Sequence, residues 1–103
     1  MNTDFRISTS LFHHPKLLRL RKELGPEGAL CLIQLWGFAA TNRPGGKLGA
    51  MSTADIALAA GWSGDPQPFI DALVDLRWLD VRRQTYYLHG WHEHQRVSDL
   101  SLD

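Results

Sequence analysis

Residues 65–91, DPQPFIDALVDLRWLDVRRQTYYLHGW, decide the fold. Their first part repeats apolar residues at the helical period: Phe69, Ile70, Leu73, Val74 and Leu76. Residues 78–81 and 86–88 are strand-like and are joined by residues 82–85, so a short amphipathic helix followed by a β-hairpin is predicted. The helix turns outward Gln67, Asp71, Ala72 and Asp75, with no basic residue before Arg77. Its exposed side is therefore predicted to be acidic.

Two further helices are predicted nearer the N-terminus, over residues 15–24 and 27–42. The first starts with Pro15, where a missing N–H costs nothing, and it is stopped by Gly25 and Pro26. Its inner stripe consists of Leu17, Leu18, Leu20 and Leu24. The second is apolar nearly all round, which predicts either a central buried helix or a shared dimer surface.

The middle of the chain carries turn and capping signals. Residues 43–46, RPGG, break the second helix, and residues 47–51 are predicted to form a short strand. Ser52 and Asp55 fit a capping box at the start of a helix over residues 53–60. Asp65 or Ser63 is expected to cap the helix that follows. Residues 5–7 alternate apolar and polar side chains and are expected to add a strand or an extended arm.

This order of elements predicts an α+β fold, mostly α: a winged helix-turn-helix with an extra N-terminal helix and a C-terminal β-hairpin wing. Residues 1–95 would form the winged-helix domain. Residues 96–103 would form a flexible tail or the start of a linker.

Length and composition restrict the class of protein. A chain of 103 residues holds one domain, and its eleven basic and eleven acidic residues cancel, so a case for nucleic acid must rest on local patches. The longest apolar stretch, residues 29–40, is too short to span a bilayer, and the N-terminus lacks a signal-peptide core. We therefore expect a cytoplasmic protein with no membrane partner.

No pattern in the sequence indicates catalysis, a metal or a cofactor. His89, His92 and His94 lack zinc-site spacing and have no cysteine partner. Cys31 lies in the apolar helix, where an inert buried thiol is expected. The PGGK segment at residues 44–47 lacks the spacing of a phosphate-binding loop. We therefore expect a protein that is not an enzyme.

Five segments together resemble the N-terminal winged-helix domain of phage and prophage replication proteins, the replisome-organiser group related to DnaD-type primosomal proteins. They are FHHPKLLRLRKELG (residues 12–25), EGALCLIQLWGFA (27–39), IALAAGW (56–62), FIDALVDLRWLDV (69–81) and YYLHGWHEHQ (86–95). The resemblance implies a module of a longer protein that binds DNA near an origin, self-associates and helps to load a helicase. The chain would then be an excised domain or a short stand-alone relative.

The leading functional hypothesis is anchoring of double-stranded DNA through phosphate contacts, with weak sequence selectivity. The candidate residues are Lys16, Arg19, Arg21, Lys22, Arg43, Lys47, Arg77, Arg82 and Arg83. The acidic helix argues against base reading by that helix, because carboxylates repel phosphates.

Two alternatives remain open from the sequence. The first is a docking module, in which Asp71, Asp75, Tyr87 and Trp91 form a protein interface and the two aromatic residues are half exposed. Its partner would be a second copy of the chain, or a replication protein such as a helicase or its loader. The second is a small winged-helix transcriptional regulator.

Overall fold

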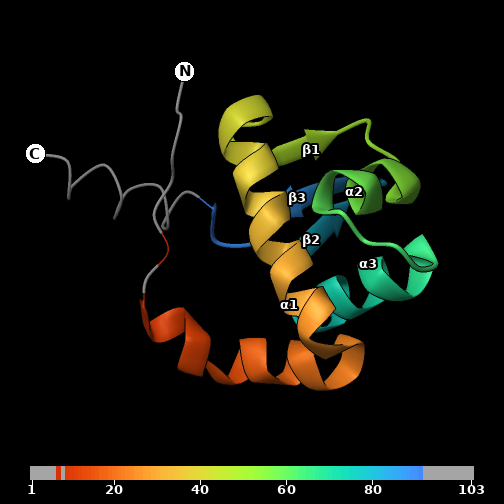
Figure 1. Ribbon diagram of the computed structural model, residues 1–103. Coiled ribbons are helices and arrows are strands. Elements are labelled where there is room, and N and C mark those ends of the chain that lie inside the picture. Colours follow the sequence, from red (N-terminus) through yellow and green to blue (C-terminus); the bar gives the residue numbers. More distant parts are fainter. Residues whose placement is uncertain (1–6, 8, 92–103) are drawn as a thin grey trace, which may run out of the picture.

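The computed structural model describes residue 7 and residues 9–91 (Figure 1). The elements in these residues are η1 (Thr9–His13), α1 (Pro15–Asn42), β1 (Lys47–Gly49), α2 (Thr53–Ala60), α3 (Pro66–Asp75), β2 (Leu79–Arg82) and β3 (Thr85–Leu88). The fold is α+β and mostly helical, with a small three-stranded antiparallel sheet. The short helix η1 was not predicted. Most of the expected N-terminal arm and the whole tail over 96–103 lie outside the described residues.

The bend in α1 lies at the predicted boundary between two helices. The Nδ1 atom of His14 accepts the N–H of Lys16 at 3.1 Å, which caps the helix before Pro15. Gly25 has φ 79° and ψ 178°, a non-helical conformation that suits glycine and lets the chain restart at Pro26. The predicted break at Gly25 is therefore confirmed: α1 consists of two helical segments that meet at a kink. We call residues 15–24 the first arm and residues 26–42 the second arm; the two run in clearly different directions in Figure 1.

The starts of α2 and α3 follow the predicted capping chemistry. Ser52 Oγ accepts the N–H of Asp55 at 3.1 Å, and Asp55 Oδ2 accepts the N–H of Ser52 at 3.2 Å. Asp65, rather than Ser63, caps α3 by accepting the N–H of Gln67 at 3.2 Å. Both helices therefore begin where local hydrogen bonds satisfy their first N–H groups.

The sheet has the strand order β1-β3-β2, and both pairings are antiparallel. Arg82 pairs with Thr85, so the β2–β3 loop contains only Arg83 and Gln84. It is two residues shorter than the predicted loop over residues 82–85. Both loop residues have positive φ, 50° and 64°, as a type I′ hairpin turn requires. The turn is thus made by two side-chain-bearing residues in a conformation that glycine or asparagine adopts at lower cost.

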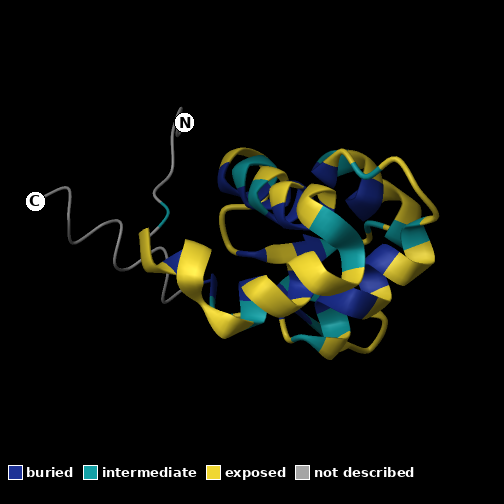
Figure 2. Ribbon diagram, turned by 60° about the horizontal axis from the view of Figure 1, so that its bottom comes forward, coloured by how far each residue is buried: buried dark blue, intermediate teal, exposed yellow. Residues whose placement is uncertain are grey.

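The core lies where the three α-helices and the inner face of the sheet meet. Its most deeply buried side chains include Leu20, Leu32, Leu35, Leu48, Ile56, Phe69, Ile70, Leu73 and Leu79. Figure 2 shows that buried residues gather where the elements face one another, whereas η1 and the first arm of α1 are largely exposed. No helix in residues 7 and 9–91 is long and apolar enough to cross a membrane.

Three predictions of exposure were wrong. Leu18, expected on the inner stripe of the first helix, is 46% exposed, whereas its neighbour Leu17 is buried. Ala72, expected on the outer side of α3, is only 5% exposed. The buried face of the helix is wider than the stripe of large apolar side chains suggested. Trp91, expected to be half exposed, is only 4% exposed, because it packs against the loop before β1. The predicted burial of Cys31 is confirmed at 1% exposure.

Candidate functional site

The outer face of the sheet brings two of the predicted basic residues to one tyrosine. Lys47 on β1 and Asp80 on β2 both pair with Tyr87 on the central strand, so the three form a row across the sheet. Arg82 follows Asp80 by two positions and shares its face, because side chains alternate along a strand. The Arg82 guanidinium carbon lies 5.0 Å from the centroid of the Tyr87 ring, a cation–π distance. Tyr87 is half-buried, as predicted, and has a cation on either side.

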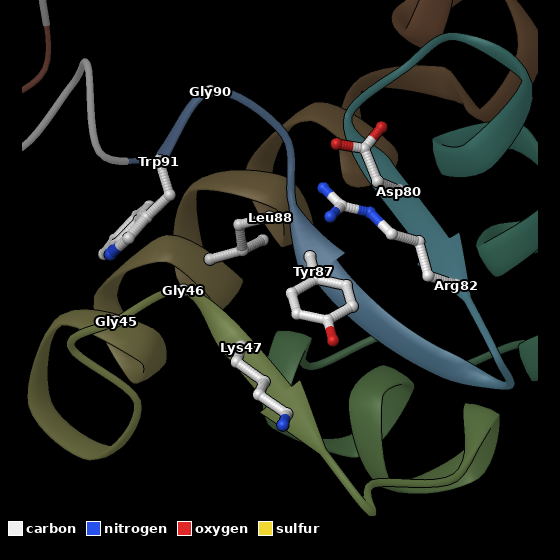
Figure 3. A pocket seen from close by; sticks show the side chains of 9 residues that line it. All are labelled: Gly45, Gly46, Lys47, Asp80, Arg82, Tyr87, Leu88, Gly90 and Trp91. Atoms are coloured by element: carbon white, nitrogen blue, oxygen red, sulfur yellow. The ribbon is translucent and has the colours of Figure 1, made fainter.

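A cleft of about 520 Å³, which we call the Tyr87 cleft, opens beside this row. Figure 3 shows its lining: Gly45, Gly46, Lys47, Asp80, Arg82, Tyr87, Leu88, Gly90 and Trp91. In this view the Arg82 side chain extends between Asp80 and the Tyr87 ring, and the ring of Trp91 lies toward the loop at Gly45 and Gly46. Three of the nine residues are glycines, so part of the wall is bare backbone.

Trp91 forms a fixed wall of the cleft. Its Nε1 donates a hydrogen bond to the carbonyl of Pro44 at 2.8 Å. A Cβ on Gly46 would lie 2.6 Å from Trp91 Cδ1, and Gly46 has φ +79°, so both the contact and the backbone require glycine there. The Trp91 ring therefore packs against the loop before β1 and is shielded from solvent.

Asp80 and His89 are paired at the other side of the cleft. His89 Nδ1 lies 2.9 and 3.0 Å from the two carboxylate oxygens of Asp80. A second, more open groove of about 650 Å³ continues from this pair along β2 and the end of α3. It is lined by Val74, Asp75, Arg77, Leu79, Asp80, Val81, Arg82 and His89. Arg82 and Asp80 therefore border both depressions.

Lys16 has a structural contact that the sequence did not reveal. Its Nζ donates to the carbonyl oxygen of Arg77 at 2.7 Å and lies 4.4 Å from the centroid of the Trp78 ring. Partial burial lowers the pKa of the Lys16 ammonium, attraction to Asp80 opposes that shift, and repulsion by Arg77 adds to it. The ammonium group thus ties the first arm of α1 to the corner between α3 and β2.

The remaining basic candidates are exposed but dispersed. Arg19, Arg21 and Lys22 lie on the first arm of α1 and line neither of the two depressions described above. Arg43 caps the end of α1, where its N–H donates to the carbonyl of Ala39 at 2.7 Å. Arg83 lies at the tip of the hairpin. The structure therefore groups Lys47 with Arg82 at the cleft, Arg82 with Arg77 along the second groove, and Arg77 with Lys16, and leaves the other basic candidates outside this series.

The acidic side of α3 is present as predicted. Asp71 and Asp75 are both exposed, and Gln67 Nε2 donates to Asp71 Oδ1 at 2.8 Å. Neither carboxylate lines the Tyr87 cleft. A polyanion lying on this helix would meet carboxylates first. The outer face of the sheet carries Lys47 and Arg82 with one carboxylate, Asp80, which is paired with His89, so it is the more favourable surface for phosphate.

The grouping of site residues was only partly visible in the sequence. Asp80 and His89 were not singled out as a pair, although the predicted hairpin brings the residues near its open end together. The position of Lys47 beside Tyr87 depends on pairing between β1 and β3, which no local signal specifies.

Potential metal ligands are not clustered in the part of the chain that the structure describes. Across residues 7 and 9–91, no three or more His, Cys, Asp or Glu side chains are grouped so that they could hold a metal ion. His92 and His94 lie outside that range. Burial raises the pKa of the Cys31 thiol, and the nearby Glu27 carboxylate adds to the shift, so the thiol favours its unreactive protonated form.

A scan against protein-family models, a search of curated proteins and a search of solved structures each found no match to this chain, so its resemblance to replisome-organiser domains stays a prediction.

Proposed function

We propose that this chain is a winged-helix domain of the phage-replication type that anchors double-stranded DNA through its β-hairpin and not through α3. In this assignment α2 and α3 are the helix-turn-helix, and the β2–β3 hairpin is the wing. The element order α1, β1, α2, α3, β2, β3 and the sheet order β1-β3-β2 support it. The bent α1 supplies the extra N-terminal helix as its first arm.

The observation that carries the proposal is the contrast in charge between two surfaces. The hairpin presents Arg82 and Arg83 in succession at its tip, with Lys47 on the same sheet, and its one carboxylate, Asp80, is paired with His89. The exposed side of α3 presents Asp71 and Asp75. Since release of counterions from phosphates supplies most of the affinity of weakly selective DNA binding, the duplex engages the hairpin.

Duplex binding is tested by fluorescence anisotropy with a labelled duplex over a range of salt concentrations. Wild-type protein should bind at about 50 mM salt and lose affinity steeply at higher salt. Replacing Arg82 and Arg83 with alanine should weaken binding and reduce the slope of log affinity against log salt by about 2, roughly one for each lost phosphate contact.

A matched control removes two positive charges elsewhere. The double change Arg19→Ala and Arg21→Ala alters the net charge equally but affects the first arm of α1. The proposal requires a smaller loss of affinity for this variant than for the hairpin variant. Equal losses would show a diffuse charge effect, and no duplex binding at low salt would refute the proposal.

A second candidate function, docking to another protein, is favoured by one observation on the helical side of the molecule. Leu58 on α2 is 79% exposed, and α2 packs directly against α3, which carries the exposed Asp71 and Asp75. Apolar and acidic groups on neighbouring helices suit a partner with a basic, partly apolar surface. Trp91 cannot contribute to such an interface, because it is buried.

Light scattering tests self-assembly through this surface. A strictly monomeric wild type rules out self-assembly, and Leu58→Gln should dissociate any oligomer.

A further inference from the structure

We propose that the Tyr87 cleft holds an unpaired base of single-stranded DNA, stacked on the Tyr87 ring, with Lys47 and Arg82 at the flanking phosphates. This inference rests on the proposed function, because it names the form of DNA that one part of the hairpin surface would recognise.

Tyr87 is not needed to complete the core. The inner face of the sheet is filled by Leu48, Leu79 and Leu88, which are all buried, whereas Tyr87 points to the opposite face. Its neighbour Tyr86 packs against the core instead. The Tyr87 ring is therefore an aromatic surface on the outer face of the sheet, half open to solvent.

The groups around the ring match the chemistry of a single-strand site. Such sites combine aromatic rings, on which bases of any sequence can stack, with cations that follow the phosphate backbone. Here Lys47 lies on one neighbouring strand and Arg82 on the other. The carboxylate of Asp80 also lines the cleft, but it is paired with His89 and lies beyond Arg82 from the ring in Figure 3. The Arg82 guanidinium carbon lies 5.0 Å from the ring centroid, over the surface that a base would cover. The proposal therefore requires a base to replace the guanidinium on the ring and the Arg82 side chain, which is exposed, to reach a phosphate.

The dimensions of the cleft favour one extruded base over a duplex. Its volume of about 520 Å³ lies within the roughly 300–1,000 Å³ typical of small-ligand sites. The bare backbone of Gly45 leaves open space, since a Cβ there would meet nothing within 4 Å. A paired base is stacked inside the helix and must be extruded at a cost before it can enter such a pocket. Unpaired DNA avoids that cost.

Two substitutions at the same position separate stacking from other roles of Tyr87. Tyr87→Phe keeps the ring and loses the hydroxyl, whereas Tyr87→Leu removes the ring and keeps an apolar side chain. In anisotropy titrations with labelled oligo(dT), the Phe variant should bind like wild type. The Leu variant should bind about tenfold more weakly, the loss expected for one stacked base. Its affinity for a blunt duplex should change by less than about twofold, because phosphate contacts alone hold the duplex.

Cross-linking gives a measurement on the unaltered protein. Short-wave ultraviolet light should cross-link oligo(dT) to the wild-type chain, and peptide mapping should find the adduct at Tyr87. Adducts found only elsewhere would overturn the inference, as would equal oligo(dT) binding by the Leu variant and wild type, or equal losses in the Phe and Leu variants. If the Arg82/Arg83 variant still loses duplex affinity in those cases, the proposed function stands without this inference. Absence of binding to either form of DNA at low salt would refute both.

Discussion

The ammonium group of Lys16 donates a hydrogen bond to the carbonyl oxygen of Arg77, although the two residues are 61 positions apart in the chain. Arg77 has φ 63°, a left-handed conformation that exposes its carbonyl at the corner between α3 and β2. A lysine predicted to contact phosphate is thereby engaged within the protein. Its substitution should affect folding more than DNA binding.

Lys16→Met tests this difference. Methionine keeps an apolar stem but loses the hydrogen bond to Arg77 and the cation over Trp78, so the free energy of unfolding should fall by about 1–2 kcal/mol. The control Arg19→Met, on the exposed side of the same arm, should stay within about 0.5 kcal/mol of wild type. Urea denaturation measures both. Equal midpoints for wild type and Lys16→Met would show that the contact does not stabilise the fold.

Gln84→Gly should stabilise the hairpin. Gln84 has φ 64° in a two-residue turn, where glycine has no steric cost, so unfolding should require about 0.5–1 kcal/mol more free energy. Gln84→Ala keeps the cost and serves as the control. Thermal melts of the three proteins should rank glycine above glutamine and alanine. A glycine variant that melts no higher than the alanine variant would contradict the turn geometry.

Replacement by alanine should change the stability of the protein by very different amounts at the two adjacent glycines before β1. Gly46→Ala places a methyl group 2.6 Å from Trp91 Cδ1 at a positive φ, so we expect a loss of about 2 kcal/mol or more. Gly45→Ala meets nothing within 4 Å and should change stability by less than about 0.5 kcal/mol. Chemical denaturation followed by tryptophan fluorescence compares them, and similar losses for the two would mean that Trp91 does not pack as described.

Cys31 should make stability fall in alkaline solution. Burial raises the pKa of its thiol above the unfolded value of 9.0, so the unfolded chain loses this proton first as pH rises. The native state then binds more protons, and the free energy of unfolding decreases from about pH 9 upward. Lys16 has the opposite effect on the free energy of unfolding, because its pKa is lowered in the folded protein. As the pH rises toward the unfolded value of 10.5, the native state loses this proton before the unfolded chain does. Measured between pH 8 and 10, Cys31→Ala should show a shallower decrease than wild type, and an identical slope would count against this account.

Local signals in the sequence predicted the boundaries of elements well. The capping box of Ser52 and Asp55 depends on residues three apart, and the kink at Gly25 depends on two adjacent residues, so both are encoded within one turn of chain. The inward residues Phe69, Ile70 and Leu73 follow from helical period alone. The α+β order of helices and strands could therefore be predicted from the sequence.

Long-range contacts could not be predicted in the same way. The wall made by Trp91 depends on a loop 47 positions earlier, and the Lys47–Tyr87 row depends on which strand edge β1 joins. Each is chosen by the packing of the whole domain and not by neighbours in sequence. The candidate site consists mainly of such contacts, so Lys47, Arg82, Tyr87 and Trp91 were named individually from the sequence, whereas their grouping and the part of Asp80 were not.

The kink at Gly25 has a mechanical consequence when it is considered together with Lys16. The two arms of α1 meet at Gly25, and glycine restricts its dihedral angles less than any other residue. This residue alone would therefore fix the angle between the arms only weakly. Lys16, near the far end of the first arm, is fastened to Arg77 and Trp78, and Leu17 and Leu20 are embedded in the core beside it. The orientation of the first arm therefore depends on contacts with the core and with the start of the hairpin, and not on the Gly25 dihedral angles alone.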